Sequence, residues 1–286
     1  RSFEEMVETV REKAKGEAQF IDGIMFSKEF GVVMIGVLSD DTNLPRATCH
    51  RAIDEWFYLH AKTIATRGSI KDERIPVRDY LFRYDRGAFW MGRYGFSILK
   101  LPFTRLTRFL MNGICSTRTL YRFFHETHLS QKYIVQDFNL PSSNAVAFLE
   151  HIDTETGIYP LWVCPLRPGR EDRLSANSVE SDLVFNIGVW GEADKDFSEF
   201  VALNKDLERT LSEMGGRKML YAHSYYSREE FWKTYDEAWY NSLRRAYSAE
   251  SAFPDVYEKT KVSERYQPSI LTGIWNALRF PKLRLS

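Results

Sequence analysis

The sequence has few cysteines, no excess charge and no long apolar run, and each shortage excludes a class of protein. Its three cysteines form no C-x-x-C pair and no N-x-S/T sequon occurs, so we expect a reducing, intracellular location and no disulfide framework. The 39 basic and 39 acidic residues cancel, which argues against a nucleic-acid partner because no net field attracts a polyanion. Apolar runs such as 31–38 are far shorter than the roughly 20 residues that span a bilayer. We therefore expect the protein in the cytoplasm or on the cytosolic face of an internal membrane, with at most peripheral membrane contact.

What is present is the composition of a globular protein. Of the 286 residues, 44% are apolar and 15% aromatic. This is enough to bury a large core without stabilisation by disulfides or metal ions. A charged amphipathic helix is expected near the start, and no apolar signal core is visible. We interpret the chain as a single α+β domain, residues 1–286, in four parts. These are a helix-hairpin-helix part (1–66), an irregular aromatic and basic helical insertion (67–130), a regular part (131–224) and C-terminal helices (225–286).

The regular part alternates strand-like and helix-like patterns. Apolar strand patterns and amphipathic helix patterns follow one another in the order β-α-β-β-α-β, which is typical of a ferredoxin-like unit. Such a unit forms an antiparallel sheet with its helices on one face. We expect the hairpin predicted over 20–38 to join the same, mostly antiparallel sheet. After it, Ser227 and Glu230 form an S-x-x-E capping box that should open a helix.

Strand alternation predicts which side chains share a sheet face. In "LVFNIGVW" (183–190) every second residue from Leu183 is apolar and should pack under the helices, which leaves Asn186 and Trp190 on the opposite face. The last strand is expected over 218–224, with Tyr221 and His223 on that same opposite face. The sequence therefore predicts a polar and aromatic patch there.

Five segments carry unusual combinations of aromatic and charged residues. They read "IPVRDYLFRYDRGAFW", "YIVQDFNLP", "GIYPLWVCPLRP", "FNIGVWGE" and "KMLYAHSYYSREEFWKTYDEAWYNSLRR", the last followed by "AFPDVYEK". Their order and spacing resemble the Δ24-sterol reductase family, flavoproteins with a vanillyl-alcohol-oxidase-like fold, over most of residues 20–260. The resemblance implies the C-terminal substrate or cap domain of an FAD-linked oxidase, with a hydrophobic pocket for a sterol or terpenoid.

The sequence departs from the family in its cofactor motifs. Family members carry a glycine-rich flavin-binding domain ahead of the matching part, whereas this sequence has no G-x-G-x-x-G and no P-loop. We expect the chain to lack that domain and to bind no cofactor alone, with FAD and a nicotinamide involved only if such a domain exists. The pair His125 and His128 in "FHETH" does not have the spacing of a zinc motif, so no metal is expected.

The resemblance implies alkene reduction, in which a flavin supplies hydride and a protein acid supplies the proton. Tyr221 and His223 are the candidate catalytic donors. An aromatic pocket with a few polar groups suits a hydrophobic polycyclic ligand. The predicted substrate-binding residues are Trp90, Asp137, Tyr159, Trp162, Asn186 and Trp190. For each, a purely structural role is the competing interpretation.

Two other functions stay open at this point. A stand-alone, flavin-free cyclase, isomerase or Diels–Alder-type pericyclase could use the same pocket to fold a terpenoid or polyketide intermediate in natural product biosynthesis. A non-catalytic lipid binder is the weaker alternative. The segment 96–114, "FSILKLPFTRLTRFLMNGI", fits either a buried helix pair or an interfacial membrane anchor. A homodimer is compatible with all of these functions.

Overall fold

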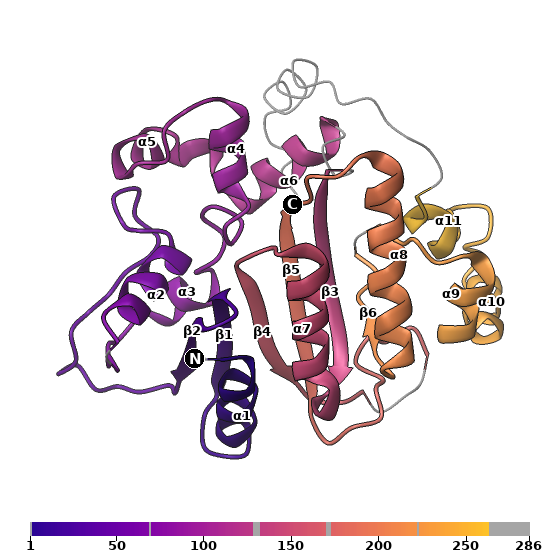
Figure 1. Cartoon of the computed structure of the whole chain (residues 1–286), viewed down its shortest axis with the longest axis horizontal. Helices are drawn as coiled ribbons and strands as arrows, with labels where there is room; N and C mark the ends of the chain where they lie inside the picture. The colour runs from indigo at the N-terminus through magenta and orange to yellow at the C-terminus, as the bar shows by residue number, and fades with distance from the viewer. Residues whose placement is uncertain (1, 69, 128–131, 170–172, 222, 263–286) are drawn as a thin grey trace. The chain divides into compact units, whose positions relative to one another are not determined.

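The structure, a computed structural model, describes residues 2–68, 70–127, 132–169, 173–221 and 223–262 (Figure 1). The chain divides into two compact units, which we describe separately. The first comprises Arg1–Gly36 and Lys132–Arg265, and the second Val37–Gln131 and Tyr266–Ser286. The single functional domain expected over 1–286 stays a prediction.

The first unit contains one six-stranded sheet. Its strands are β1 (Phe20–Ser27), β2 (Phe30–Gly36), β3 (Tyr133–Pro141), β4 (Leu161–Leu166), β5 (Val184–Glu192) and β6 (Arg217–Lys218). They lie in the order β2-β1-β4-β5-β3-β6, and every neighbouring pair is antiparallel. The predicted α+β fold and ferredoxin-like strand order are therefore confirmed, and the hairpin β1–β2 extends the sheet beside β4.

Three helices cover one face of this sheet, as α7 and α8 do in Figure 1. They are α1 (Phe3–Ala14), α7 (Ala145–Thr156, preceded by the short η3, Ser142–Asn144) and α8 (Phe197–Glu213). Local signals set their ends: Asp196 and Glu199 form the capping box of α8, and Gly157 ends α7 with a left-handed φ of 58°. None of the helices in the described part of the chain is long and apolar enough to cross a membrane.

The buried residues follow the predicted alternation. Phe185, Ile187 and Val189 of β5 lie in the core beneath the helices, so Asn186 and Trp190 project from the opposite side. We call this opposite side, away from α1, α7 and α8, the distal face. It carries the side chains from which the candidate site is built.

The last predicted strand is much shorter than expected. β6 spans only Arg217–Lys218, although the N–H of Met219 still donates to the carbonyl of Asp137 at 3.0 Å. The ammonium of Lys218 donates to the carbonyl of His223, which removes that carbonyl from any sheet ladder. The prediction of a strand over 218–224 was wrong because a buried side chain, invisible to strand periodicity, turns the chain back.

C-terminal helices complete the first unit. They are α9 (Arg228–Thr234), α10 (Glu237–Ala246) and α11 (Val256–Thr260). The predicted capping box opens α9: the N–H of Glu230 donates to the hydroxyl of Ser227 at 3.2 Å, and the N–H of Ser227 donates to the carboxylate of Glu230 at 2.7 Å. A separate aromatic core holds these helices, formed by Tyr226, Phe231, Tyr235 and Tyr257.

The second unit consists of short helices and loops, as the sequence indicated. Its helices are α2 (Phe57–Thr66), α3 (Val77–Leu81), α4 (Gly92–Ile98), α5 (Arg105–Leu110), η1 (Asn112–Ile114) and α6 (Thr117–Glu126). A helix over 47–65 is also suggested by the pattern, but α2 begins only at Phe57. The guanidinium of Arg86 binds the carbonyls of Cys49, Ala52 and Asp54 at 3.1 Å, so these carbonyls are satisfied without helical bonds.

Candidate functional site

A buried carboxyl group lies in the middle of the distal face. The amide of Gln136 donates to Asn204 of α8 at 3.1 Å, so the next side chain, Asp137, points the other way. Asp137 pairs with Gly188 of β5 and is only 6% exposed. Its Oδ1 has no hydrogen bond among the described residues. Such an oxygen is costly unless a proton, a water or a ligand completes it.

Tyr221 connects this carboxyl group to an indole. The Nε1–H of Trp190 donates to the hydroxyl oxygen of Tyr221 at 3.1 Å, and Tyr221 also hydrogen-bonds to Asp137. Because an indole can only donate, the hydroxyl proton of Tyr221 is directed to Asp137 when that group is a carboxylate, and is released from it when Asp137 is protonated and donates instead. Tyr221 is half exposed, whereas Asp137 and Trp190 are buried. The hydroxyl is thus the accessible end of a hydrogen-bonded chain.

The titration of Asp137 suits proton transfer. Burial raises the pKa of this carboxyl from 3.8 to about 7, and the hydrogen bond from Tyr221 opposes the rise only in part. A group with a pKa near neutrality is populated in both protonation states, as a general acid or base requires. Sequence reasoning placed Asp137 among the substrate-binding residues, and the geometry adds an acid–base capability to that prediction.

Gly188 provides the space in which these groups meet. A Cβ atom at this position would lie 2.8 Å from Oδ1 of Asp137 and 2.8 Å from the ring of Trp190. Both distances are below normal van der Waals contact. The absence of a side chain therefore lets the carboxyl group and the indole approach one another.

A second acid and indole lie further along the same face. Trp162 of β4 donates from Nε1 to Oδ2 of Asp22 at 3.1 Å, and its ring centroid lies 5.7 Å from that of Trp190. Asp22 of β1 is 1% exposed and was missed at the level of sequence. Its signal is a single acid alternating with apolar residues in "FIDGIMF", but only the pairing of β1 with β4 shows what it faces.

Amide side chains occupy the neighbouring position. The Nδ2 of Asn186 donates to Oδ1 of Asn139 at 2.7 Å, and Asn139 donates to Asn177 at 2.9 Å. Within the described residues, Oδ1 of Asn186 is buried without a hydrogen bond. The pairs Asp137–Gly188 and Asn139–Asn186 are successive on this face. Asp137 and Asn186 therefore each have, among the described residues, an acceptor oxygen without a hydrogen bond in the same part of the sheet.

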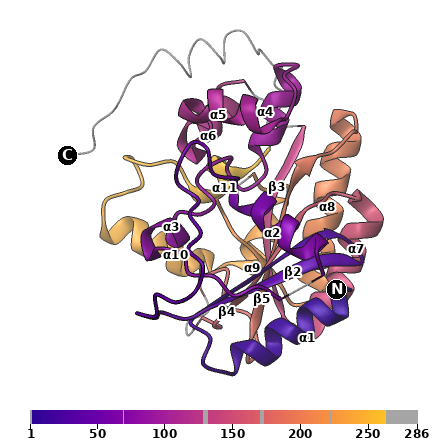
Figure 2. The same cartoon turned by 90° about the vertical axis from the view of Figure 1, so that its left-hand side faces the viewer.

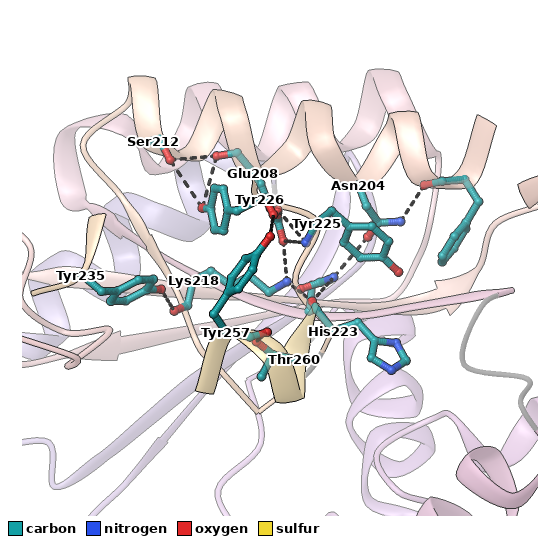
Figure 3. Close-up of polar contacts among 12 residues, drawn as sticks. Asn204, Glu208, Ser212, Lys218, His223, Tyr225, Tyr226, Tyr235, Tyr257 and Thr260 are labelled. Atoms are coloured by element: carbon teal, nitrogen blue, oxygen red, sulfur yellow. Dashed lines mark hydrogen bonds and ion pairs between the residues drawn. The ribbon is translucent and has the colours of Figure 1, made fainter. Parts of the chain in front are cut away.

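A buried ion pair lies next to the backbone of His223 (Figure 3). The ammonium of Lys218 lies 2.6 Å from the carboxylate of Glu208, and both side chains are at most 1% exposed. Burial raises the pKa of Glu208 and lowers that of Lys218, while their mutual attraction opposes both changes. The N–H of Tyr225 donates to both carboxylate oxygens at 3.0 Å. The pair is thus well satisfied, as a buried pair must be.

His223 contributes its backbone to this arrangement. Its carbonyl accepts hydrogen bonds from Lys218 and, at 3.3 Å, from the amide of Gln136. Figure 3 shows its imidazole ring pointing away from Glu208 and Lys218. The structure therefore explains the fixed backbone of His223, and it shows Tyr221 hydrogen-bonded to Asp137. The catalytic role of His223 stays a prediction.

Two other predicted residues have contacts of their own, and their role in binding substrate stays a prediction. Tyr159 donates its hydroxyl to Asp153 at 2.7 Å and packs against the core beneath the helices. Trp90 belongs to the second unit, where its ring lies 6.2 Å from Tyr58. No group of three or more metal-ligating side chains occurs among the described residues. The pair in "FHETH" extends outside the described residues at its second histidine.

The start of α8 does not fit the pyrophosphate of a flavin dinucleotide. Such a group needs free N–H donors and a positive environment at a helix N-terminus. At the start of α8, Asp196 accepts from the N–H of Glu199 at 2.9 Å, and Glu199 accepts from the N–H of Asp196 at 3.2 Å. Two carboxylates thus occupy this helix N-terminus, and the expectation that the chain binds no cofactor alone stays a prediction.

Comparison with known proteins finds similarity to Δ24-sterol reductases. The chain is 28% identical to the Δ24-sterol reductase of Mus musculus over 270 residues, which is 90% of this chain and 50% of the mouse protein. It is 26% identical to the Δ24-sterol reductase homologue of Caenorhabditis elegans and 24% identical to the Δ24-sterol reductase of Arabidopsis thaliana. The chain spans about half the length of these relatives. No family model and no solved structure matches it.

Proposed function

The chain is a homologue of the Δ24-sterol reductases, and from this kinship we propose that it forms the substrate-binding part of an oxidoreductase acting on a double bond of a sterol or related terpenoid. The observation that carries the proposal is the hydrogen-bonded chain from Trp190 through Tyr221 to Asp137. It places an acid of nearly neutral pKa among aromatic rings. The half-buried ring of Trp162, 5.7 Å from that of Trp190, offers apolar aromatic surface that suits a polycyclic ligand.

In this proposal the chain supplies the proton of the reduction. Saturating a double bond adds a hydride to one carbon and a proton to the other. Tyr221 gives its hydroxyl proton to the second carbon and takes the carboxyl proton of Asp137, which becomes a carboxylate. The Nε1–H of Trp190 stabilises the negative charge that develops on the tyrosine oxygen. The hydride comes from a donor that the described residues do not hold.

Substrate capture and proton transfer can be tested separately. We expect the purified chain to bind a Δ24 sterol, with quenching of tryptophan fluorescence, and Tyr221→Phe to bind it about equally well. In the enzyme with its hydride donor, Tyr221→Phe and Asp137→Asn should each lower kcat roughly 100-fold or more. In D2O the wild-type product should carry one solvent deuterium at the protonated carbon.

Two results would contradict the proposal. One is sterol binding no tighter than the binding of a straight-chain lipid of similar hydrophobicity. The other is full turnover by Tyr221→Phe, which would mean that the proton comes from a different donor. The relatives support an oxidoreductase and give no support to the cyclase, isomerase or pericyclase alternatives.

A further inference from the structure

Helix α5 of the second unit exposes its apolar side chains and buries a charged one. Its side chains Leu106, Phe109 and Leu110 are spaced i, i+3 and i+4 and so share one helix face. They are 66%, 47% and 68% exposed. Arg108, in contrast, is buried. An ordinary surface helix turns its apolar stripe inward and its charges outward, and α5 does the opposite.

The buried arginine fixes this orientation. The guanidinium of Arg108 lies 2.6 Å from the carboxylate of Glu55 and 4.8 Å above the ring of Phe103. Thr104 and Thr107 close a reciprocal capping box at the start of the helix. Turning the apolar stripe inward would break the ion pair and pull the guanidinium off the ring. The exposure of the stripe is therefore a built feature of this unit.

The segment that contains α5 is basic, and the acidic side chain beside it, Glu55, pairs with Arg108 and lies 4.0 Å from Arg105. Residues 86–125 contain seven Lys and Arg residues and no Asp or Glu, although the whole chain has zero net charge. Figures 1 and 2 both show α4, α5 and α6 next to one another. Four of the basic residues of this segment are exposed: Arg93, Lys100, Arg105 and Arg118. The apolar stripe thus belongs to a positively charged surface.

We propose that this surface, formed by α5 and the basic residues around it, docks on a lipid bilayer that contains anionic headgroups. Leu and Phe side chains inserted at the headgroup boundary, with Lys and Arg around them, are the combination that binds such a surface. A second copy of the chain is a poorer occupant, because a two-fold contact would bring the same basic residues together. The proposal is independent of the proton donor and concerns where the protein meets a membrane-dissolved substrate.

The test is flotation of the full chain with lipid vesicles. We expect it to float with vesicles of equal parts phosphatidylcholine and phosphatidylserine, and much less with phosphatidylcholine alone. The triple variant Leu106→Ser, Phe109→Ser and Leu110→Ser should bind roughly 100-fold more weakly. Reversing Lys100 and Arg93 to Glu should cost at least fivefold for each residue. Because all five side chains are exposed, thermal midpoints should not change.

A matched control comes from the same unit. Three exposed apolar side chains lie in α3 and directly after it: Val77 (52% exposed), Leu81 (58%) and Phe82 (68%). Changing all three to Ser removes a similar apolar area. Vesicle binding should survive this change. Three results would overturn the proposal: equal loss in the α3 control, no binding to anionic vesicles, or a wild-type dimer that the α5 variant dissociates. The last of these would identify a second copy of the chain as the occupant.

Discussion

Trp190 donates its Nε1–H to the hydroxyl of Tyr221 at 3.1 Å, and the same hydroxyl is hydrogen-bonded to Asp137. The carboxyl group lies behind the tyrosine on a buried part of the sheet. Two properties follow: the acid titrates near neutrality, and its geometry depends on neighbours that a sequence pattern does not connect. The first three predictions test these properties and the support beneath them.

Asp137 should make stability depend on pH in a defined direction. Its pKa is about 7 in the folded protein against an ordinary 3.8, so the folded state binds this proton more tightly. The resulting stabilisation is complete below about pH 4 and is lost as the pH rises through about 7, a change of about 4 kcal/mol.

Asp137→Asn removes this titration because the amide stays neutral. Between pH 5 and pH 8, we expect the free energy of unfolding in urea to fall by about 2 to 3 kcal/mol more for the wild type than for the variant. If the unfolding free energies of the two proteins changed with pH in parallel, the pKa of Asp137 would be the same in the folded and unfolded states, which would contradict the prediction.

Gly188→Ala should disturb the acid without touching the core. The new methyl group would press on Oδ1 of Asp137 and on the ring of Trp190. We expect a loss of about 1 to 3 kcal/mol in unfolding free energy and a changed pH profile, since the hydrogen bonds around Asp137 must move. Gly113→Ala is the control, because nothing lies within 4 Å of its added Cβ. Equal effects of the two changes would mean that the close approach at 188 is relieved at no cost.

Lys218→Met should be among the most damaging single changes in the first unit. It leaves the carboxylate of Glu208 buried without its cation, which typically costs about 3 to 5 kcal/mol. Adding Glu208→Gln should recover part of this loss, since the neutral amide oxygen can still accept from the N–H of Tyr225. Urea unfolding of both proteins measures the recovery.

The surface pair of Arg209 and Glu213, with both side chains at least 56% exposed, provides the comparison. Arg209→Met should cause no measurable loss, because exposed pairs contribute little. If Lys218→Met proves equally harmless, water must reach Glu208 and the pair is not the support inferred from its burial.

The sequence predicts the sheet better than it predicts the site. Alternation in 183–190 correctly assigns Phe185 to the helix-covered side and Asn186 to the other, because one buried face imposes period two on a strand. It fails at Lys218, whose partner Glu208 lies on a helix ten residues earlier. The role of Asp22 is missed for the same reason, since its hydrogen-bond partner Trp162 is 140 residues away in the sequence. Periodicity reports burial, whereas polar partnerships across elements require the strand register and helix placement.

The unbroken pairing of β3 with β5, from Tyr133 opposite Glu192 to Pro141 opposite Val184, limits how this protein can change in length. Deleting one residue of β5 between Phe185 and Gly188 would exchange the faces of the strand segment beyond the deletion, and large apolar side chains would then face Asp137. In the connection between β4 and β5, the described residues 167–169 and 173–183 belong to no strand and so have no register to keep, although Asn177 must stay within reach of Asn139. Insertions should therefore be tolerated in that loop, while the strands beside the acid should accept substitutions but no change in residue number.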